Sequence, residues 1–497
     1  MKILGNFRWG ASLLIPIFLL GSCDSLLDVE PESQISEALF WKTDKDVNSG
    51  VAAIYDAAQK AYGKKYFIWG ELRSDNFQPI PSGNNDAGLQ LMTNGLTDQN
   101  EDVSGWTNIY NMILKANIAI NAIKANDISG DIDNYLGQAH ALRAFAYFDL
   151  VRAYGDVPLY LEQITGVNDN IFREKTSGEQ IMQEVIIPDM LEAERLITTQ
   201  KDKATFSKAA VYCLQAEIYM YLGENQKAKD CLDKLEAFND YSLTSEPLEF
   251  HALFRNELPS AEVPEDLQEN GPELIFSIVY NIDEDLNQAG IYGIFWPGTP
   301  TYGISALLEE KWLSTFPSDS AEFVTKYPDF TVVNKDEEGN LMYGDYQRFG
   351  QLIEEAKIPG ERRYAKYNTT NYPTRDDDTD IVVYRYGGML LLKAEAEAKL
   401  GNSQAAVDLV NRIRAARQLP QINIADYPTQ EAVLNVVLDE RQFELFAEGE
   451  RWHDLRRNNK AVEVLGPING QTEDKLLFPI FFEHLVENPN LTQTEGY

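Results

Sequence analysis

The chain has 497 residues, with 43 Lys or Arg against 78 Asp or Glu and a formal net charge of -35. Hydrophobic residues make up 44% of it and aromatic residues 11%, which is enough to bury a large core and excludes wholesale disorder. The negative charge, without any basic cluster, argues against binding to nucleic acid and against adhesion to anionic lipid through a polybasic patch.

The N-terminus has the pattern of a signal peptide that ends in a lipid-modified cysteine. Two basic residues, Lys2 and Arg8, precede an uncharged run from Trp9 to Leu20, which is too short to span a membrane. The run closes with Leu20-Gly-Ser-Cys23, which resembles the bacterial lipobox, where the cysteine is diacylated and becomes the new N-terminus. We therefore expect residues 1–22 to be removed and Cys23 to carry a stable lipid anchor. The alternative is an ordinary signal peptide that happens to meet a cysteine.

Three segments after the signal show apolar residues at helical spacing. They are Asp44–Ala61, Trp106–Ile123 and Tyr135–Tyr154. The third is followed by Gly155 and Pro158, which end a helix because glycine permits a reversal and proline cannot continue the hydrogen-bond ladder.

Two later segments share the pattern of a helical hairpin. Each has an alanine, a glycine seven residues later and a second alanine five residues after that: Ala216, Gly223 and Ala228 in the first, and Ala394, Gly401 and Ala406 in the second. Small residues let two helix axes approach closely, and the glycine permits the turn, as in tetratricopeptide repeats. The copies are dispersed along the chain, so it is not a plain solenoid. We predict a mainly α fold in which residues 23–497 form one compact domain of tetratricopeptide-like hairpins, with long irregular loops and minor β structure.

Cys213 and Cys231 lie on either side of the first turn glycine. Antiparallel helices could bring them close enough for one disulfide, but two cysteines are too few for a disulfide framework. We expect two buried free thiols.

Three long stretches between the helical segments are neither periodic nor helical. They cover residues 62–95, 256–303 and 326–380. Loops of this length are usually functional or disordered, and their aromatic content argues against disorder. We therefore expect the ligand-binding loops within residues 62–95 and 256–380.

No catalytic motif is apparent in the sequence. There is no phosphate-binding glycine loop, nucleophile elbow, His-Glu-x-x-His or Cys-x-x-Cys. The densest charged segment, Glu440–Arg457, includes His453, but on a helix Glu444 and Glu448, or Glu448 and Arg451, would be neighbours that form ion pairs. We interpret this segment as structural and predict a protein that is not an enzyme.

Acidic residues leave two questions open. The run Asp376–Asp380 offers oxygen ligands to calcium but lacks the spacing of an EF-hand, so we interpret it as a solvated loop and predict no metal and no cofactor. A glycoside hydrolase with two catalytic carboxylates stays open, because such a pair is defined by its separation in space.

Several segments together resemble the SusD/RagB family of nutrient-binding outer-membrane lipoproteins of Bacteroidetes. They are the lipobox with Asp24–Pro31, and then Phe40–Thr43, His140–Leu159, Tyr384–Ala396, Asn411–Arg414, Arg441–Arg456, Phe478–Ile480 and Asn488–Tyr497. The resemblance implies a compact helical domain anchored by lipid in the outer membrane and facing the cell surface. It also implies a SusC-like TonB-dependent transporter as partner, over which the lipoprotein closes as a lid, and an activity of capture rather than catalysis.

The segments that carry the resemblance belong to the scaffold, so the ligand site must be inferred from the loops. A sugar ring needs an aromatic face to stack on and polar groups that meet its hydroxyls. The candidate platforms are Trp69, Tyr292, Trp296 and Tyr302, and the candidate polar partners are Arg73, Asp75 and Asn76. For each aromatic residue, packing against the scaffold is the alternative.

Three functions follow from the sequence. The first is a surface lipoprotein that binds oligosaccharide or polysaccharide and delivers it to the transporter. The second is a peptide-binding lid of a RagA/RagB-like importer, and the third is a lipid-anchored glycoside hydrolase.

Overall fold

The structure is a computed structural model that describes residues 40–80, 88–162, 171–254, 271–281, 288–291, 294, 302–336, 338–350, 366–367 and 379–497. Contacts divide the chain into a short unit, Met1–Trp41, and a large unit, Lys42–Tyr497. Cys23 lies outside the described residues.

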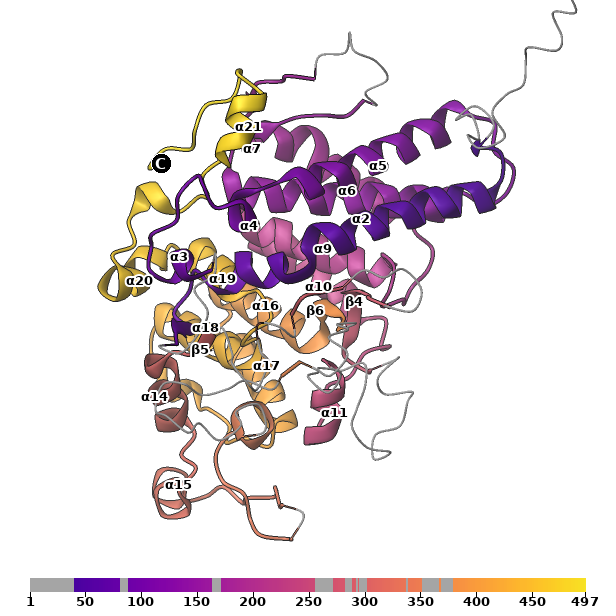
Figure 1. The fold of residues 1–497 in the computed structure, drawn as a ribbon. Helices are drawn as coiled ribbons and strands as arrows, with labels where there is room; N and C mark the ends of the chain where they lie inside the picture. Colours follow the sequence, from indigo (N-terminus) through magenta and orange to yellow (C-terminus); the bar gives the residue numbers. More distant parts are fainter. Residues whose placement is uncertain are drawn as a thin grey trace, which may run out of the picture. The chain divides into compact units, whose positions relative to one another are not determined.

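The large unit is mainly helical, with a few short strands (Figure 1). Its α-helices are α2 (Asp44–Glu71), α3 (Leu89–Met92), α4 (Glu101–Ser104), α5 (Thr107–Ala125), α6 (Asp133–Tyr154), α7 (Gly178–Ile181), α8 (Ile187–Leu196), α9 (Lys208–Tyr221), α10 (Asn225–Glu236), α11 (Pro247–Ala252), α14 (Ala306–Thr315), α15 (Ser320–Lys326), α16 (Tyr386–Lys399), α17 (Ser403–Ala416), α18 (Gln430–Glu444), α19 (Arg451–Arg457), α20 (Ala461–Asn469) and α21 (Phe482–Glu487). Shorter helical turns are η2 (Met182–Ile186), η3 (Tyr346–Gly350), η4 (Ile424–Asp426) and η5 (Glu473–Lys475). The strands are β1 (Phe77–Pro79), β2 (Val157–Pro158), β3 (Lys175–Thr176), β4 (Leu274–Ile278), β5 (Tyr302–Ile304) and β6 (Ile381–Arg385).

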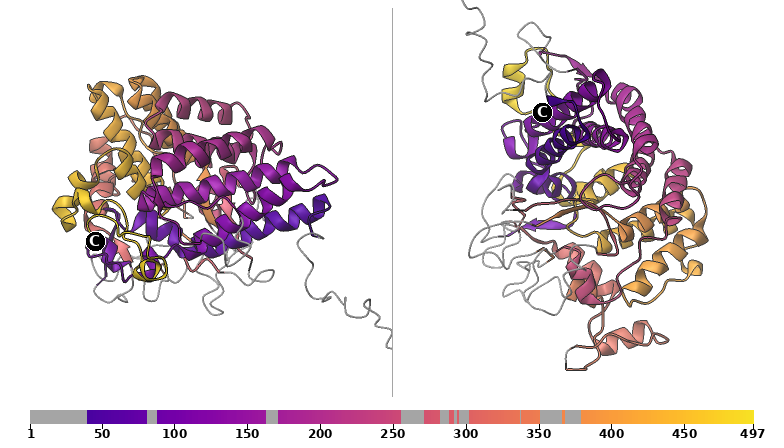
Figure 2. Two further views of the ribbon diagram at one scale, coloured as in Figure 1. Left: turned by 90° about the horizontal axis from the view of Figure 1, so that it is seen from above. Right: turned by 90° about the vertical axis from the view of Figure 1, so that its right-hand side faces the viewer.

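The long helices pack one against the next in an arc (Figure 2, right). The order of contact is α2, α5, α6, α8, α9, α10, α16, α17 and α18. Residues 237–385 separate α10 from α16 in the chain, yet the two helices lie side by side. The predicted helical scaffold is therefore confirmed, and the two dispersed hairpins are joined into one stack.

The two predicted hairpins have the expected turn. Gly223 connects α9 to α10 with a φ of +74°, and Gly401 connects α16 to α17 with a φ of +84°. This left-handed backbone favours glycine. The four alanines of the pattern, Ala216, Ala228, Ala394 and Ala406, are all 0% exposed.

Helix α2 extends beyond the prediction. It continues from Ala61 to Glu71, so the prediction of an irregular segment is wrong for residues 62–71. The aromatic residues that suggested a loop are buried on this helix, with Tyr62, Phe67 and Trp69 at most 4% exposed. The helix bends at Gly63, whose φ is 30° and ψ is -133°.

Minor β structure and free thiols are also confirmed. The strands form three two-stranded antiparallel pairs, β1 with β5, β2 with β3, and β4 with β6. Cys213 and Cys231 are both free and buried, and the Sγ of Cys231 lies 3.4 Å from the Oε1 of Gln215. Within the described ranges, no helix combines the length and the hydropathy needed to cross a bilayer.

Buried charges hold the C-terminal half together. We call this set the Glu444 cluster; it pairs five acids, Asp345, Glu273, Glu440, Glu444 and Glu448, with five bases, Arg348, Lys366, Arg385, Arg414 and Arg417. Glu444 lies at its centre and contacts Arg417 at 2.6 Å, Arg385 at 2.8 Å and Arg348 at 3.2 Å. Burial acts to raise the pKa of Glu444, but these three guanidinium groups hold it well below its usual value. The acid is therefore ionised in the folded protein.

We expect Glu444→Gln to lower the free energy of unfolding by about 3–5 kcal/mol, because the substitution leaves buried guanidinium groups without their counter-charge. Urea denaturation at pH 7 measures the loss. Asp56→Asn is the matched control: it removes one partner of an exposed pair with Lys60, whose side chains are 40% and 50% exposed, and should cost about 0.5 kcal/mol or less. Because the depressed pKa of Glu444 stabilises the fold only above the unfolded value near about 4.3, the deficit should shrink as pH falls through this range. Equal losses at the two positions would contradict the assignment.

We further expect Gly70→Ala to destabilise the protein, although alanine normally favours a helix. A Cβ at Gly70 would lie 1.6 Å from the carbonyl oxygen of Gly449, which is backbone and cannot move aside. The expected loss is about 1–3 kcal/mol or more, measured by thermal unfolding. At Gly95 the nearest atom would be 3.4 Å from the new Cβ, so Gly95→Ala should leave the midpoint nearly unchanged. A tolerated Gly70→Ala would show that α2 does not pack closely on Gly449.

Candidate functional site

The three segments predicted to bind ligand begin or end at two short sheets. In the first sheet Pro79 pairs with Tyr302, so the chain that follows β1 and the chain that precedes β5 meet at the same edge. In the second sheet Ile278 pairs with Ile381, so the chain after β4 and the chain before β6 also share an edge. These pairings bring together the ends of all three segments, 62–95, 256–303 and 326–380, which are separate in the sequence.

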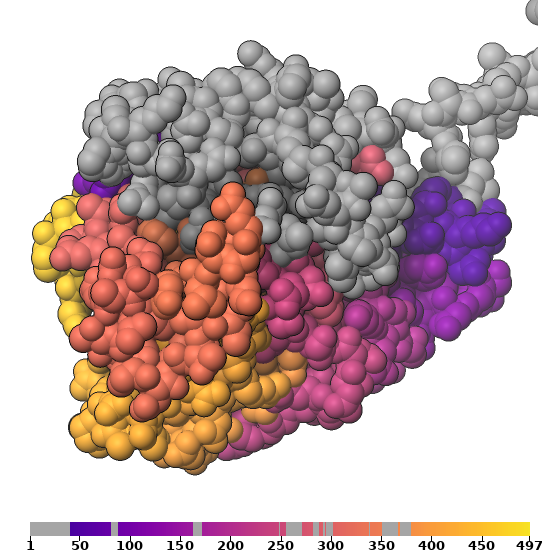
Figure 3. Space-filling view, turned by 90° about the horizontal axis from the view of Figure 1, so that it is seen from below, coloured from indigo at the N-terminus to yellow at the C-terminus, as the bar shows by residue number. Residues whose placement is uncertain are grey.

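Further contacts fix these segment ends to their neighbours. The backbone N–H of Ser305 donates to the carbonyl oxygen of Asn76 at 2.8 Å, and the amide Nε2 of Gln347 donates to the carbonyl oxygen of Ser245 at 2.7 Å. In Figure 3 the segment 302–350, in salmon, lies beside the residues before 254, in magenta. The described borders of the loops are therefore built as one rigid support.

The hydroxyl of Tyr280 joins the end of β4 to the bend in α2. It accepts from the N–H of Gly63 at 3.0 Å and donates to the carbonyl of Gln59 at 2.7 Å. In a regular helix these two backbone groups would bond to each other, so the inserted hydroxyl accounts for the bend. The side chain of Gln59 returns a bond to the carbonyl oxygen of Val279 at 2.8 Å.

The structure contradicts a platform role for Trp69. Its ring is 4% exposed and contacts the rings of Tyr154 and Phe478, and its Nε1 donates to the carbonyl of Val103 at 2.8 Å. A sugar cannot stack on a ring that the core covers on both sides. The prediction from sequence was wrong because a tryptophan in a continuing helix was interpreted as part of a loop.

Arg73 is likewise part of the core. It is 1% exposed, lies over the ring of Trp452 at 5.0 Å and donates to the carbonyl of Leu477 at 3.1 Å. Its role is to hold the C-terminal segment to α2, and it is not available to a ligand.

Asp75 and Asn76 bind the charged C-terminal motif instead of a ligand. Asp75 accepts two hydrogen bonds from the guanidinium of Arg451, at 2.8 and 3.0 Å. Asn76 is 0% exposed and accepts from the amide of Gln442 at 2.8 Å, while its own amide donates to Glu71 at 2.6 Å. Their predicted role as sugar partners is therefore not supported by the geometry, because their polar atoms are already paired within the fold.

Of the three remaining candidate platforms, one belongs to the core and two lie outside the described residues. Tyr302 is 2% exposed in β5, paired with Pro79, so its ring is part of the support. Tyr292 and Trp296 lie outside the described residues. They stay predictions.

The charged segment Glu440–Arg457 has a different local geometry from the one expected. Helix α18 ends at Glu444, and the chain turns through Ala447 and Gly449, whose φ values are +65° and +80°. The predicted helical pairs are therefore wrong: Glu448 bonds to Arg385 at 2.6 Å, and Arg451 bonds to Asp75. The ion pairs join distant parts of the chain, which agrees with a structural role.

No metal centre is seen in the described ranges, where His, Cys, Asp and Glu do not gather in groups of three or more that could hold an ion. Of the acidic run Asp376–Asp380, Thr379 and Asp380 are described and residues 376–378 are not. Asp380 is buried and accepts from the N–H of Tyr280 at 3.1 Å. The prediction of a solvated loop is wrong at this position.

Sequence reasoning missed an aromatic groove of about 370 Å³ between α5 and α21. Tyr110, Tyr160 and Phe172 line it, and Trp106 stacks on His484 at 5.3 Å with the rings nearly parallel. Phe172 is 45% exposed. The lining comes from three separate stretches of the chain, so no local pattern in the sequence could reveal it.

The sequence matches two models of protein families. Residues 296–497 match the SusD family, and residues 25–220 match a family described as starch-binding and associating with the outer membrane. SusD-like protein P38 of Formosa agariphila is 41% identical over 510 residues, which cover 100% of both chains.

Solved structures share the fold. NanU of Bacteroides fragilis superposes with a TM-score of 0.69 at 22% identity, covering 94% of this chain and 100% of that one. A laminarin-binding SusD-like protein superposes with a TM-score of 0.71 at 19% identity, covering 92% and 100%. The matching family models, the full-length relative and the common helical fold all agree, and the chain belongs to the SusD family.

Proposed function

We propose that this protein captures oligosaccharide or polysaccharide at the cell surface and delivers it to a SusC-like TonB-dependent transporter. The observation that carries the proposal is that the ends of three long segments, 62–95, 256–303 and 326–380, meet at the edges of two short sheets. One rigid support thereby holds together stretches that are far apart in the chain, which is how a binding surface is usually built from loops. The laminarin-binding relative of the same fold supports a glycan as the ligand class.

Tyr292 and Trp296 are the residues we propose as stacking platforms. Both stand in the segment that leads to Tyr302, and both rings offer a flat apolar face with a polar edge. Trp69 and Tyr302, which belong to the core, are no longer candidates.

Capture rather than catalysis is the proposed activity. Burial raises the pKa of Glu71 to about 7, the range expected of a general acid, but this carboxyl is 0% exposed. It accepts from the N–H of Ala447 at 3.0 Å and from that of Gly449 at 3.1 Å. Glu71 thus stabilises a turn of the scaffold. Its raised pKa therefore does not support a role in glycoside hydrolysis.

A peptide ligand is the second candidate. The aromatic groove between α5 and α21 favours it, because the groove is lined mainly by apolar groups and has exposed Ile171 and Phe172 at its edge. Apolar side chains of a peptide would fit such a surface better than a hydroxylated sugar would.

Affinity electrophoresis tests the glycan and places its site. The soluble chain from Asp24 is run through gels that contain plant, fungal or host polysaccharides. We expect retardation by one glycan and a loss of about ten-fold or more in affinity for Trp296→Ala, since stacking and its buried area disappear together.

Phe172→Ala is the companion variant, because this exposed ring lies in the aromatic groove. Loss of retardation in Phe172→Ala alone would move the site to the groove. If no glycan retards the protein, a peptide ligand is favoured. If the glycan disappears during the run, glycoside hydrolase activity is favoured.

We also propose that Cys23 anchors the protein in the outer membrane, with residues 23–497 facing the cell surface. Cys23→Ser should abolish incorporation of labelled palmitate and move the protein from the detergent phase to the aqueous phase of a Triton X-114 partition. Cys213→Ser and Cys231→Ser are the controls, since both thiols are buried and free. Label retained in Cys23→Ser would exclude Cys23 as the acylation site.

A further inference from the structure

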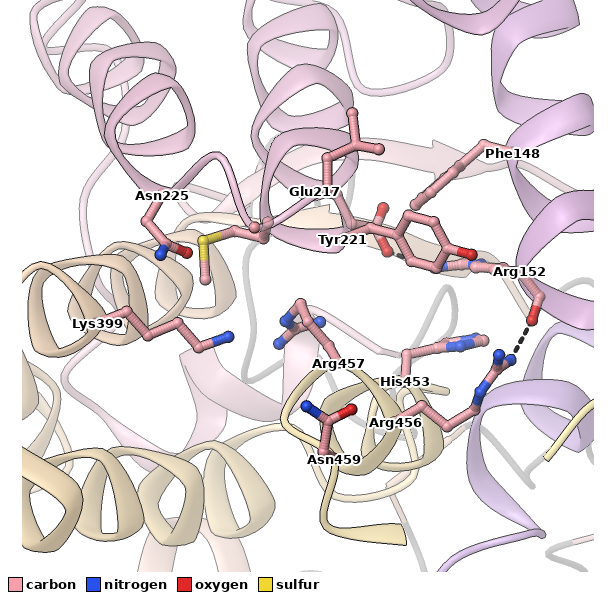
Figure 4. A pocket seen from close by; sticks show the side chains of 13 residues that line it. Phe148, Arg152, Glu217, Tyr221, Asn225, Lys399, His453, Arg456, Arg457 and Asn459 are labelled. Carbon is pink, nitrogen blue, oxygen red and sulfur yellow. Dashed lines mark hydrogen bonds and ion pairs between the residues drawn. The ribbon is translucent and has the colours of Figure 1, made fainter. Parts of the chain in front are cut away.

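A second cavity lies where the ends of several helices meet (Figure 4). Its volume is about 350 Å³, and its walls come from the C-terminal ends of α6, α9 and α16, the start of α10, and α19. None of the residues that line it belongs to the two sheets that support the ligand loops. The cavity is therefore a site of its own, independent of the proposed glycan capture.

Basic side chains dominate the walls of this cavity. Arg152, Lys399, Arg456 and Arg457 line it, against a single acid, Glu217. The chain as a whole has 43 basic and 78 acidic residues, so the walls of this cavity have the opposite balance.

Most of these bases have a carboxylate partner in the wall itself or behind it. Arg152 pairs with Asp149 and Glu217, Arg457 pairs with Glu395 and Asp454, and Lys399 pairs with Glu395. Arg441, which does not line the cavity, also pairs with Glu395 and Asp454. These four bases and four acids balance each other.

Glu450 does not alter this balance. It lies 3.2 Å from Arg441. Burial, together with the nearby Glu217, raises the pKa of Glu450 to about 8. The group is therefore mainly uncharged at neutral pH.

Arg456 is the base left over. Its Nη1 donates to the carbonyl oxygen of Arg152, and its guanidinium lies over the ring of Trp452 at 5.9 Å. No carboxylate of the described residues pairs with it. A guanidinium has five N–H donors, and a single carbonyl satisfies only one of them.

Capping of helix ends explains only part of this arrangement. Lys399, Arg456 and Arg457 lie in the last turns of α16 and α19, where bases offset the negative end of a helix dipole. Such a partial charge is about half an elementary charge and is shared by several bases. It does not supply the bidentate acceptor that fits a guanidinium.

Uncharged polar groups complete the walls. His453 points into the cavity beside Arg456, and Asn459 lies at its rim (Figure 4). The Oδ1 of Asn225 is buried without a hydrogen-bond partner. A rotated Asn225 amide would present its N–H groups to an acceptor in the cavity.

The electrostatics of the neighbouring groups agree with an excess of positive charge. Burial, together with the nearby Arg73 and Arg152, lowers the pKa of Arg456 to about 10. Burial and the three arginines 152, 456 and 457 hold the pKa of His453 well below its usual value, so the imidazole is neutral.

We propose that this cavity binds one small organic anion, whose carboxylate or sulfate group pairs with Arg456. The guanidinium and the anion would then neutralise each other in a partly dry site, where such pairs are strongest. Tyr221, 39% exposed at the same cavity, offers a ring face for the apolar side of the ligand. The volume fits a molecule of about the size of one sugar acid.

Isothermal titration of the purified mature protein with D-glucuronate tests this site, in buffer without multivalent anions. D-glucose is the neutral probe of the same size, and inorganic sulfate is the second anion. We expect glucuronate to bind and glucose not to bind, with binding weakened by added salt. Sulfate that binds and displaces glucuronate would support the site and identify the sulfate group as sufficient.

Two variants test the position of the anion. Arg456→Gln should weaken binding by about ten-fold or more, because a charge-assisted hydrogen bond is lost. Asn459→Asp should weaken it to a similar degree by placing a like charge at the rim; this residue is exposed and its φ of 55° suits aspartate, so the fold should persist even if Arg456→Gln fails to fold.

Arg195→Gln is the control for the total charge, since Arg195 is 64% exposed on α8 and pairs only with Glu192 among the described residues. The affinity of the Arg195→Gln variant for glucuronate should equal that of the wild type. Absence of binding by both anions, or equal binding by the wild type and the Asn459→Asp variant, would overturn the proposal.

Discussion

Carboxylates that are buried from water must be neutralised within the protein, and the Glu444 cluster applies this constraint to six separate stretches of the chain at once. Glu273 stands directly before β4, Arg385 closes β6 and Arg348 lies in η3. All three are 0–1% exposed and their charges depend on one another. Because removing one partner would leave a buried charge, the ends of the long loops cannot move apart without a large energetic cost.

The same logic explains why the polar residues near the first loop are not ligand groups. Asp75 and Asn76 connect the end of α2 to Gln442 and Arg451, more than 360 residues later in the chain. Glu71 accepts two further hydrogen bonds from the backbone of the turn that follows α18. The charged motif of the C-terminus and the polar motif of the N-terminus are therefore two halves of one structural contact.

The strongly acidic chain also contains a locally basic cavity, and the two facts are related. Most of the buried acids among the described residues pair with arginines, so a base without a carboxylate partner, such as Arg456, creates a site for an anion even in a protein with a net charge of -35. The net charge therefore argues against the binding of polyanions such as nucleic acid to the surface, but it does not describe the local charge in one cavity.

The sequence by itself determined the helical scaffold, because helical spacing, turn glycines and small residues act within a few neighbours. The hairpins around Gly223 and Gly401 and the helices near Trp106 and Tyr135 follow from such local patterns, and the lipobox-like end and the family segments are equally local. Only the tertiary structure decided that Trp69 and Arg73 belong to the core, that α18 stops at Glu444, and that Arg456 has no carboxylate partner among the described residues. Burial and charge pairing are set by residues that lie hundreds of positions apart, and no pattern of neighbouring residues carries that information.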